Sequence, residues 1–185
     1  GDDILYVIVK GKLANGEKIP GVVGTTMTNL ALENYLKNEG INFIRANVGD
    51  KYVLNEMKKN NYDLGGETSG HILMLNHSTS GDSIIAALQF LFYSDILDKN
   101  NIDGVLDKYP QQITNIFFKQ GLPENIINIA IKEASDKFSN DELRLIIRKS
   151  GTENCIRVMV EAKEKNIVDK ESMHIKEYIE NKLES

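Results

Sequence analysis

The sequence predicts an α/β fold in two parts: a three-layer α/β domain with a mixed, largely parallel sheet, followed by a small α+β domain. Strand and helix signals alternate along the first half, as expected for a parallel sheet covered by helices. The second half runs in the order strand, helix, strand, strand, helix. A polar segment with Gly104 and Pro110 separates the halves. We therefore expect domains over residues 1–98 and 111–185, joined by a linker or hinge over residues 99–110.

Short apolar segments bounded by turn residues indicate the strands of the first half. These expected strands are residues 19–23, 41–46, 63–66 and 71–76. Residues 4–9 (ILYVIV) are apolar as well. So short a run can be a strand or a buried helix, because periodicity does not separate the two.

Three helices are expected between these segments, each introduced by a residue whose side chain can cap a first turn. Thr26 and Thr28 can cap a helix that ends near residue 38, where Gly40 favours termination. Asp50 can cap a second helix. Asp82 can cap a strongly apolar helix that ends near residue 97.

The second half shows strand patterns over residues 113–119, 143–149 and 156–162. Pro123 suits the first turn of a helix ending near residue 138, and residues 166–183 have the pattern of a charged helix. Alternate residues of the last strand are apolar and share one face. They are Ile156, Val158, Val160 and Ala162.

The charge balance excludes one broad class of function. Of 185 residues, 22 are Lys or Arg and 27 are Asp or Glu, which gives a net charge of −5. A dedicated nucleic-acid binder usually carries a basic surface, so we expect no nucleic-acid partner. The apolar content of 41% is that of a globular chain rather than a disordered one.

The sequence shows no pattern typical of a membrane helix or of a signal peptide. The longest apolar run, residues 84–93, contains Gln89 and is shorter than the ~20 residues of a membrane helix, so we expect no membrane partner. The first residues lack the basic leader and small-residue cleavage site of a signal peptide. A single cysteine, Cys155, fits a reducing compartment, and we expect a cytoplasmic protein.

Glycines surround a carboxylate and a hydroxyl in the segment GGETSGH, residues 65–71. Glycine permits positive φ and close approach of the backbone to a ligand. In an extended loop Glu67 and Ser69 would point the same way. Together they could hold the two hydroxyls of a vicinal diol, since a carboxylate accepts and a hydroxyl both donates and accepts. His71 could orient a ligand or exchange a proton; the alternative is a glycine turn with incidental polar residues.

The segment RKSGTE, residues 148–153, lies between two expected strands and could bind an anion. Backbone N–H groups around Gly151 can form a nest for an anion, and Ser150 and Thr152 add hydroxyl donors. Arg148 supplies a forked cation suited to phosphate. Arg157, on the following strand, is a weaker candidate. The alternative is a polar hairpin turn with an exposed arginine.

Other candidates are fewer. Lys51, at an expected helix start, could attract phosphate, whereas Asp50 beside it more often caps a helix. The sequence has no His, Cys and carboxylate cluster that resembles a zinc site. Cys155 has no evident base beside it. The residues alone therefore indicate neither a zinc site nor a nucleophile–base pair.

The two motifs, in this order, resemble the α-D-phosphohexomutase family. GETSGH at residues 66–71 is similar to the family's sugar-binding loop, G-E-x-S-G-H. RKSGTE at residues 148–153 is similar to its phosphate-binding loop, R-P-S-G-T-E. Segments GVVGT, VGDKYV and IRVMVE, which begin at residues 21, 48 and 156, also resemble the amino-sugar branch.

The resemblance covers nearly the whole chain and assigns it to the third and fourth domains of a four-domain enzyme. It implies that the sugar would be bound by Glu67, Ser69 and His71. It implies that phosphate would be bound by Arg148, Ser150, Gly151 and Thr152, with Lys51 and Arg157 as further candidates. The chain departs from the usual branch residues at Thr68, Lys149 and Asn154, where Gln, Pro and Pro are common, and at Lys51, where Arg is common.

The resemblance also implies a reaction: interconversion of glucosamine 6-phosphate and glucosamine 1-phosphate through a phosphoserine, Mg²⁺ and glucosamine 1,6-bisphosphate. The family's phosphoserine loop and D-x-D-x-D metal loop lie in its first two domains, and neither occurs in this sequence. The resemblance therefore implies no catalytic residue and no metal ligand in this chain, with a supporting role left open for His71. We therefore expect a hexosamine phosphate substrate, the N-terminal domains of the same enzyme as partner, and no activity of this chain alone. Another hexose phosphate as substrate, or a non-catalytic sugar-phosphate-binding module, remains an alternative.

Overall fold

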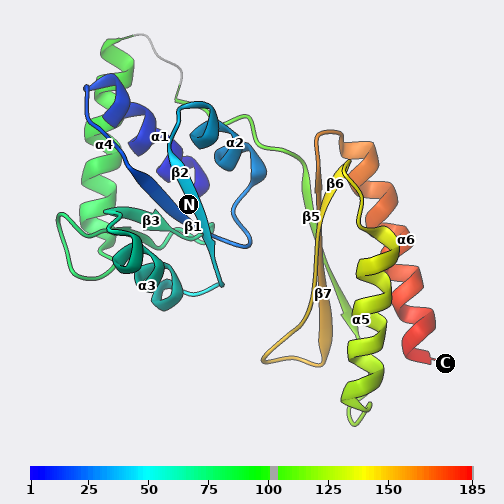
Figure 1. The fold of residues 1–185 in the computed structure, drawn as a ribbon. Coiled ribbons are helices and arrows are strands. Elements are labelled where there is room, and N and C mark those ends of the chain that lie inside the picture. Colours follow the sequence, from blue (N-terminus) through cyan, green and yellow to red (C-terminus); the bar gives the residue numbers. More distant parts are fainter. Residues whose placement is uncertain (101–103, 185) are drawn as a thin grey trace. The chain divides into compact units, whose positions relative to one another are not determined.

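The computed structural model describes residues 1–100 and 104–184. The chain divides into two compact units, Gly1–Lys108 and Tyr109–Ser185, each with its own sheet (Figure 1). Residues 101–103, in the segment expected as a linker, lie outside the described residues.

The first unit contains a four-stranded sheet in the order β2-β1-β3-β4. Its strands are β1 (Gly21–Thr25), β2 (Asn42–Ala46), β3 (Leu64–Gly66) and β4 (Ile72–Met74). Strand β1 is parallel to both β2 and β3, and β4 runs antiparallel to β3. The expected mixed, largely parallel sheet is therefore confirmed.

The helices of this unit are α1 (Asp2–Ala14), α2 (Leu30–Asn38), α3 (Asp50–Asn60) and α4 (Ser83–Lys99). Val22 and Val23 of β1 are both fully buried. Adjacent strand residues point to opposite faces, so both faces of the sheet are covered, as the three-layer prediction requires. Helix α3 packs on β1, β2 and β3, and helix α1 lies beside α4 (Figure 1).

Residues 4–9, which fit a strand or a helix equally, lie inside α1. Five consecutive residues of this helix, Leu5 to Val9, are buried. A helix buried on most of its surface carries apolar side chains all round. This is why the segment shows no helical periodicity in the sequence.

Two expected helix caps are wrong. The cap of α2 is Asn29, whose side chain accepts the N–H of Ala31, whereas the Thr28 hydroxyl accepts the N–H of Thr25. The expectation for Thr26 and Thr28 fails because Thr28 is used to close the preceding loop.

The second wrong cap is Asp50. Gly49 precedes α3, and Asp50 is the first helical residue. The Asp50 carboxylate accepts the N–H of Lys51 and so does not close the first turn. Asp82, in contrast, accepts the N–H groups of Ile84 and Ile85, so its expected capping role is confirmed.

Helix α4 is apolar on two faces. Tyr93 and Leu97 are buried. Another face exposes Ile84, Leu88, Leu91 and Phe92, with 52% to 71% of each residue accessible. No helix in the described ranges is both long and apolar enough to cross a membrane.

The second unit has an antiparallel sheet in the order β5-β7-β6, accompanied by two helices. Its elements are β5 (Gln111–Phe117), α5 (Glu124–Phe138), β6 (Leu143–Lys149), β7 (Cys155–Ala162) and α6 (Lys165–Glu184). The expected apolar face of β7 is confirmed, because its alternate residues share one buried core with Ile175 and Ile179 of α6. Pro123 is the residue before α5 rather than part of its first turn, a small correction.

Candidate functional site

The candidate residues of the first unit lie at the carboxyl edge of its sheet. Strands β1, β2 and β3 are parallel, so their carboxyl ends meet at one edge. Open α/β sheets bind ligands outside the carboxyl ends of their strands. The segments that follow β2 and β3 contain the candidates: Lys51 lies at the start of α3, and Glu67, Ser69 and His71 lie between β3 and β4.

Glu67 joins two of these loops. It is 7% exposed, and its Oε1 accepts the backbone N–H of Gly49 at 2.9 Å. Its Oε2 lies 3.3 Å from Nδ1 of His71. Gly49 has φ +127°, a conformation that favours glycine. The carboxylate is therefore held in one place, with lone pairs of both oxygens left for further donors.

The loop that carries Glu67 is a tight turn and not an extended segment. The N–H of Gly70 donates to the carbonyl of Glu67, and the N–H of Glu67 donates to the carbonyl of His71, both at 2.9 Å. Glu67 is buried whereas Ser69 is exposed. The expectation that Glu67 and Ser69 point the same way along an extended loop is therefore wrong.

Ser69 and His71 nevertheless remain open to a ligand. The side chain of His71 is 73% exposed even though its ring faces Glu67. The turn thus presents a hydroxyl and an imidazole beside a fixed carboxylate. Such a set can both donate to and accept from sugar hydroxyls.

Lys51 lies in the first turn of α3 and is exposed. The start of α3 is brought to Glu67 through the Gly49 hydrogen bond. A helix N-terminus carries partial positive charge, which adds to the charge of Lys51 and favours an anion nearby. The Gly49 hydrogen bond thus joins the start of α3, where Lys51 lies, to the loop that carries Glu67.

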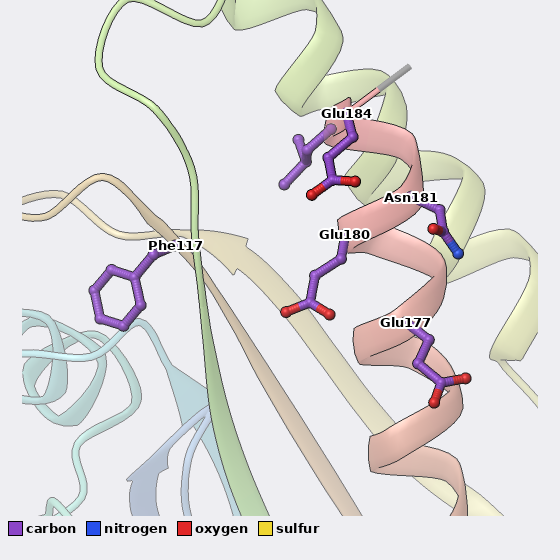
Figure 2. A pocket seen from close by; sticks show the side chains of 6 residues that line it. Phe117, Glu177, Glu180, Asn181 and Glu184 are labelled. Carbon is purple, nitrogen blue, oxygen red and sulfur yellow. The ribbon is translucent and has the colours of Figure 1, made fainter.

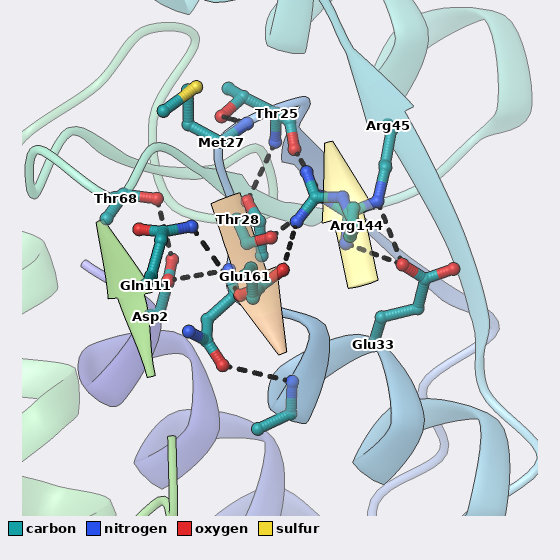
Figure 3. A network of polar contacts seen from close by, with 12 residues as sticks. Asp2, Thr25, Met27, Thr28, Glu33, Arg45, Thr68, Gln111, Arg144 and Glu161 are labelled. Carbon is teal, nitrogen blue, oxygen red and sulfur yellow. Dashed lines mark hydrogen bonds and ion pairs between the residues drawn. The ribbon is translucent and has the colours of Figure 1, made fainter. Parts of the chain in front are cut away.

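Arg45 supports the neighbouring loop, and sequence reasoning missed it. Its Nη1 donates to the carbonyls of Thr25 and Thr28 at 3.0 and 2.8 Å (Figure 3). Its Nε and Nη2 donate to Glu33 at 2.8 and 2.6 Å. The sequence could have indicated this role, because Arg45 stands near the end of an apolar strand and a partly buried charge there needs partners.

In the second unit, Ser150 organises the candidate phosphate loop. Ser150 is 5% exposed, and its Oγ faces the N–H groups of Thr152 and Glu153 at 3.4 and 3.3 Å. These two N–H groups point to Ser150, so the expected nest is partly occupied by the loop itself. Gly151 and Thr152 are both exposed residues.

Arg148 and Arg157 face each other across the β6–β7 pair, directly in register. Like charges in directly opposed positions are destabilising. Arg157 is held by Glu153 at 2.6 Å, and this hydrogen bond raises the pKa of Arg157. Across the described chain Arg148 has no ion-pair or hydrogen-bond partner. A phosphate between the two guanidinium groups would relieve the repulsion, which favours the anion-binding interpretation.

A pocket elsewhere in the second unit is lined by acidic side chains, in contrast to the cationic loop of Arg148 (Figure 2). It is lined by Phe117 of β5 and by Glu177, Glu180, Asn181 and Glu184 of α6. Carboxylates repel phosphate, so this pocket is unsuited to a sugar phosphate. Among the described residues there is also no group of three or more His, Cys, Asp or Glu that could hold a metal ion.

Comparison with protein families identifies both units. The family model "Phosphoglucomutase/phosphomannomutase, alpha/beta/alpha domain III" matches residues 1–108, and the model of the C-terminal domain of the same family matches residues 98–177. The chain belongs to the phosphoglucomutase/phosphomannomutase family. The family resemblance inferred from the two loops is therefore confirmed.

The relatives share the sequence of this chain over part of their length. A phosphoglucosamine mutase of Ralstonia pickettii is 45% identical over 177 residues, which cover 91% of this chain and 39% of the relative. A phosphoglucosamine mutase of Actinobacillus succinogenes is 42% identical over 187 residues, which cover 98% of this chain and 42% of the relative. The chain thus spans about two fifths of these relatives.

Solved structures share the fold at low sequence identity. An N-acetylphosphoglucosamine mutase of Aspergillus fumigatus matches with a TM-score of 0.71 and 18% identity, over 99% of this chain and 43% of that one. An N-acetylglucosamine-phosphate mutase in a substrate complex matches with a TM-score of 0.68 and 18% identity, over 97% of this chain and 43% of that one. These phosphohexomutases confirm the fold class.

Proposed function

We propose that this chain forms the third and fourth domains of a phosphoglucosamine mutase. The whole enzyme would interconvert glucosamine 6-phosphate and glucosamine 1-phosphate. One observation carries the proposal: the directly opposed arginines 148 and 157 stand beside the Ser150 loop, in a chain 45% identical to a phosphoglucosamine mutase. A sugar phosphate needs such a cationic fork as well as the hydroxyl-binding groups around Glu67.

Glu67 would act as the acceptor for sugar hydroxyls. Its carboxylate is fixed by the Gly49 N–H, so little ordering is required when a ligand binds. Ser69 would donate to or accept from a second hydroxyl. His71 would support the Glu67 carboxylate from its far side. The positive start of α3, with Lys51, would attract the charged ligand.

The loop at residues 148–152 would bind the phosphate that does not react. Arg148 offers a guanidinium fork that has no partner in the part of the chain that the structure describes, and Arg157 adds a second guanidinium held in place by Glu153. The Thr152 hydroxyl and the Gly151 N–H would complete the donor set. The Ser150 hydroxyl can also donate while its oxygen accepts from the loop.

The reaction itself would need parts that the first two domains of the family supply. A phosphoserine would donate its phosphoryl group, and glucosamine 1,6-bisphosphate would be the intermediate. Mg²⁺ would neutralise charge on the transferred group, and the described residues of this chain do not fit a site for it. The N-acetylphosphoglucosamine mutase of Aspergillus fumigatus has a crystal structure in complex with GlcNAc-6P and magnesium. We propose that domains equivalent to the first two of the family are the chain's partner and that the enzyme is cytoplasmic.

Isothermal titration of the chain with glucosamine 6-phosphate tests this function. Inorganic phosphate and uncharged glucosamine serve as controls, and mannose 6-phosphate and glucose 6-phosphate test the choice of sugar. We expect glucosamine 6-phosphate to bind more tightly than either control. Equal affinity for phosphate and for every sugar phosphate would reduce the assignment to an anion-binding loop, and tighter binding of another hexose phosphate would change the substrate.

A further inference from the structure

We propose that Asp2 is a positioning residue for the sugar-binding turn, residues 67–70, and that it acts by tying this turn to the start of α2. The expected effect on the binding of a hexosamine phosphate rests on the proposed function. The arrangement itself stands on geometry within the first unit.

Asp2 connects two segments that are distant in the sequence. It is 2% exposed. Its Oδ1 accepts the hydroxyl proton of Thr68 at 3.1 Å, and its Oδ2 accepts the N–H of Asn29 at 3.0 Å (Figure 3). Thr68 follows Glu67 in the turn, and Asn29 caps α2. One carboxylate thus joins the sugar-binding turn to the loop that follows β1.

The residue before Asp2 lies against the same turn. The backbone nitrogen of Gly1 lies 2.9 Å from the carbonyl oxygen of Thr68. A Cβ atom on Gly1 would lie 1.8 Å from the carbonyl oxygen of Glu67, so a larger residue does not fit there without a shift. The backbone next to Asp2 is therefore packed closely against the turn.

A simpler role for Asp2 is stabilisation of its own helix, because acids in a first turn favour the helix dipole. That role needs no burial and no distant partner. Asp2 is instead buried, and its two oxygens bind donors 66 and 27 residues away. Burying a carboxylate is costly unless it is hydrogen-bonded, so these two bonds account for its place.

The expected consequence is selective. A turn released from Asp2 would have to be ordered when the sugar binds, and that ordering lowers affinity. The partners of Asp2, Thr68 and Asn29, lie in the first unit, whereas the loop at residues 148–152 belongs to the second. Loss of the tie should weaken hexosamine phosphate binding and leave binding of inorganic phosphate unchanged.

Two pairs of variants test the tie. Thr68→Val removes the hydroxyl, whereas Thr68→Ser keeps it. Asp2→Ala removes both acceptors, whereas Asp2→Asn can still accept from Asn29 and can donate its amide to the Thr68 oxygen. We expect Thr68→Val to lower the affinity for glucosamine 6-phosphate roughly threefold to tenfold, the effect of one hydrogen bond. Thr68→Ser and Asp2→Asn should each keep most of the affinity of the natural chain for glucosamine 6-phosphate.

A second measurement needs no ligand. The amide of Gly70 is hydrogen-bonded to Glu67 inside the turn. Its hydrogen exchange should be faster in Thr68→Val and Asp2→Ala than in their conservative partners, at a temperature where circular dichroism shows each variant folded. If exchange at Gly70 is the same in all four variants, Asp2 does not order the turn and the proposal is overturned.

The two measurements separate the two claims. Should the natural chain fail to bind glucosamine 6-phosphate while Gly70 exchange still follows the Thr68 hydroxyl, the proposed function fails and the positioning role stands. Should hexosamine phosphate bind equally to Thr68→Val and Thr68→Ser, the positioning role for the ligand is refuted.

Discussion

Glu67 and Arg148 are the single residues on which the two candidate loops depend. Glu67 is fixed by Gly49, and Arg148 faces Arg157 with no partner of its own among the described residues. Their situations differ: one is a buried, hydrogen-bonded carboxylate, the other an exposed cation beside a like charge. Substitutions should therefore affect binding and stability in different ways.

Glu67→Gln should weaken hexosamine phosphate binding roughly tenfold to a hundredfold, because hydrogen bonds to a charged group are worth more than neutral ones. Binding of inorganic phosphate should be unchanged. Titration calorimetry of both ligands measures this, with Glu142→Gln, an exposed residue far from the loop in sequence, as the control. Equal loss for both ligands would show that Glu67 does not read the sugar.

Arg148→Gln should weaken phosphate binding and yet leave the ligand-free protein as stable or slightly more stable. Removing one of two opposed like charges stabilises by about 0.2–1 kcal/mol. Arg148→Lys keeps the charge and loses the fork, so it should bind phosphate less tightly without the gain in stability. Urea unfolding together with phosphate titration checks both effects; destabilisation by Arg148→Gln would argue for a structural role.

At the scale of elements, the two faces of α4 make different contributions. Leu97 is buried, whereas Leu88 is 61% exposed on the same helix. Leu97→Ala should lower the free energy of unfolding by about 2–5 kcal/mol, and Leu88→Ala should change it by less than about 0.5 kcal/mol. Urea denaturation of the two variants compares the same Leu→Ala substitution at a buried and at an exposed position. Similar losses of unfolding free energy would mean that the face of α4 with Leu88 is covered in solution.

Glu17 links α1 to α4, because it accepts hydrogen bonds from Lys12 of α1 and from the hydroxyl of Tyr93 of α4. This link should make the stability of the protein sensitive to acid. Burial disfavours the charged form of Glu17, but hydrogen bonds from Lys12, Asn15 and Tyr93 outweigh it and hold the pKa of Glu17 below its ordinary 4.5. A group whose pKa is lower in the folded state stabilises above its unfolded pKa, and this stabilisation is lost as the pH falls through the folded value.

We therefore expect the melting temperature to fall below pH 4.5, and to fall less steeply in Glu17→Gln. The comparison is made from pH 6 down to acid, with Glu142→Gln as the matched exposed control. An identical acid limb in the natural protein and in Glu17→Gln would contradict the contribution of Glu17.

The elements also show what could be predicted from the sequence. Strand alternation in β7 and the Asp82 cap depend on neighbouring residues, and both were predictable. The Thr28 cap was not, because Thr28 turns back to Thr25, and residues 4–9 lacked periodicity because they are buried on most sides. The shape of the Glu67 turn depends on backbone bonds that a residue pattern does not reveal, and Asp2 depends on partners 27 and 66 residues away.

At the scale of the whole molecule, the chain spans 39% of a phosphoglucosamine mutase that it matches. We predict no mutase turnover by the chain alone, because it would lack the phosphoryl donor and the metal. A coupled assay on protein from a host strain without endogenous mutase measures this, and turnover above that background would contradict the prediction.

The central claim is that both loops recognise parts of a hexosamine phosphate. An NMR titration of the labelled chain with glucosamine 6-phosphate, set against inorganic phosphate, tests it most directly. We predict that the sugar phosphate shifts the amides of residues 67–71 and of residues 148–152, while phosphate alone shifts only the second set. Shifts confined to residues 148–152, and equal for both ligands, would contradict the sugar-binding role of Glu67, Ser69 and His71.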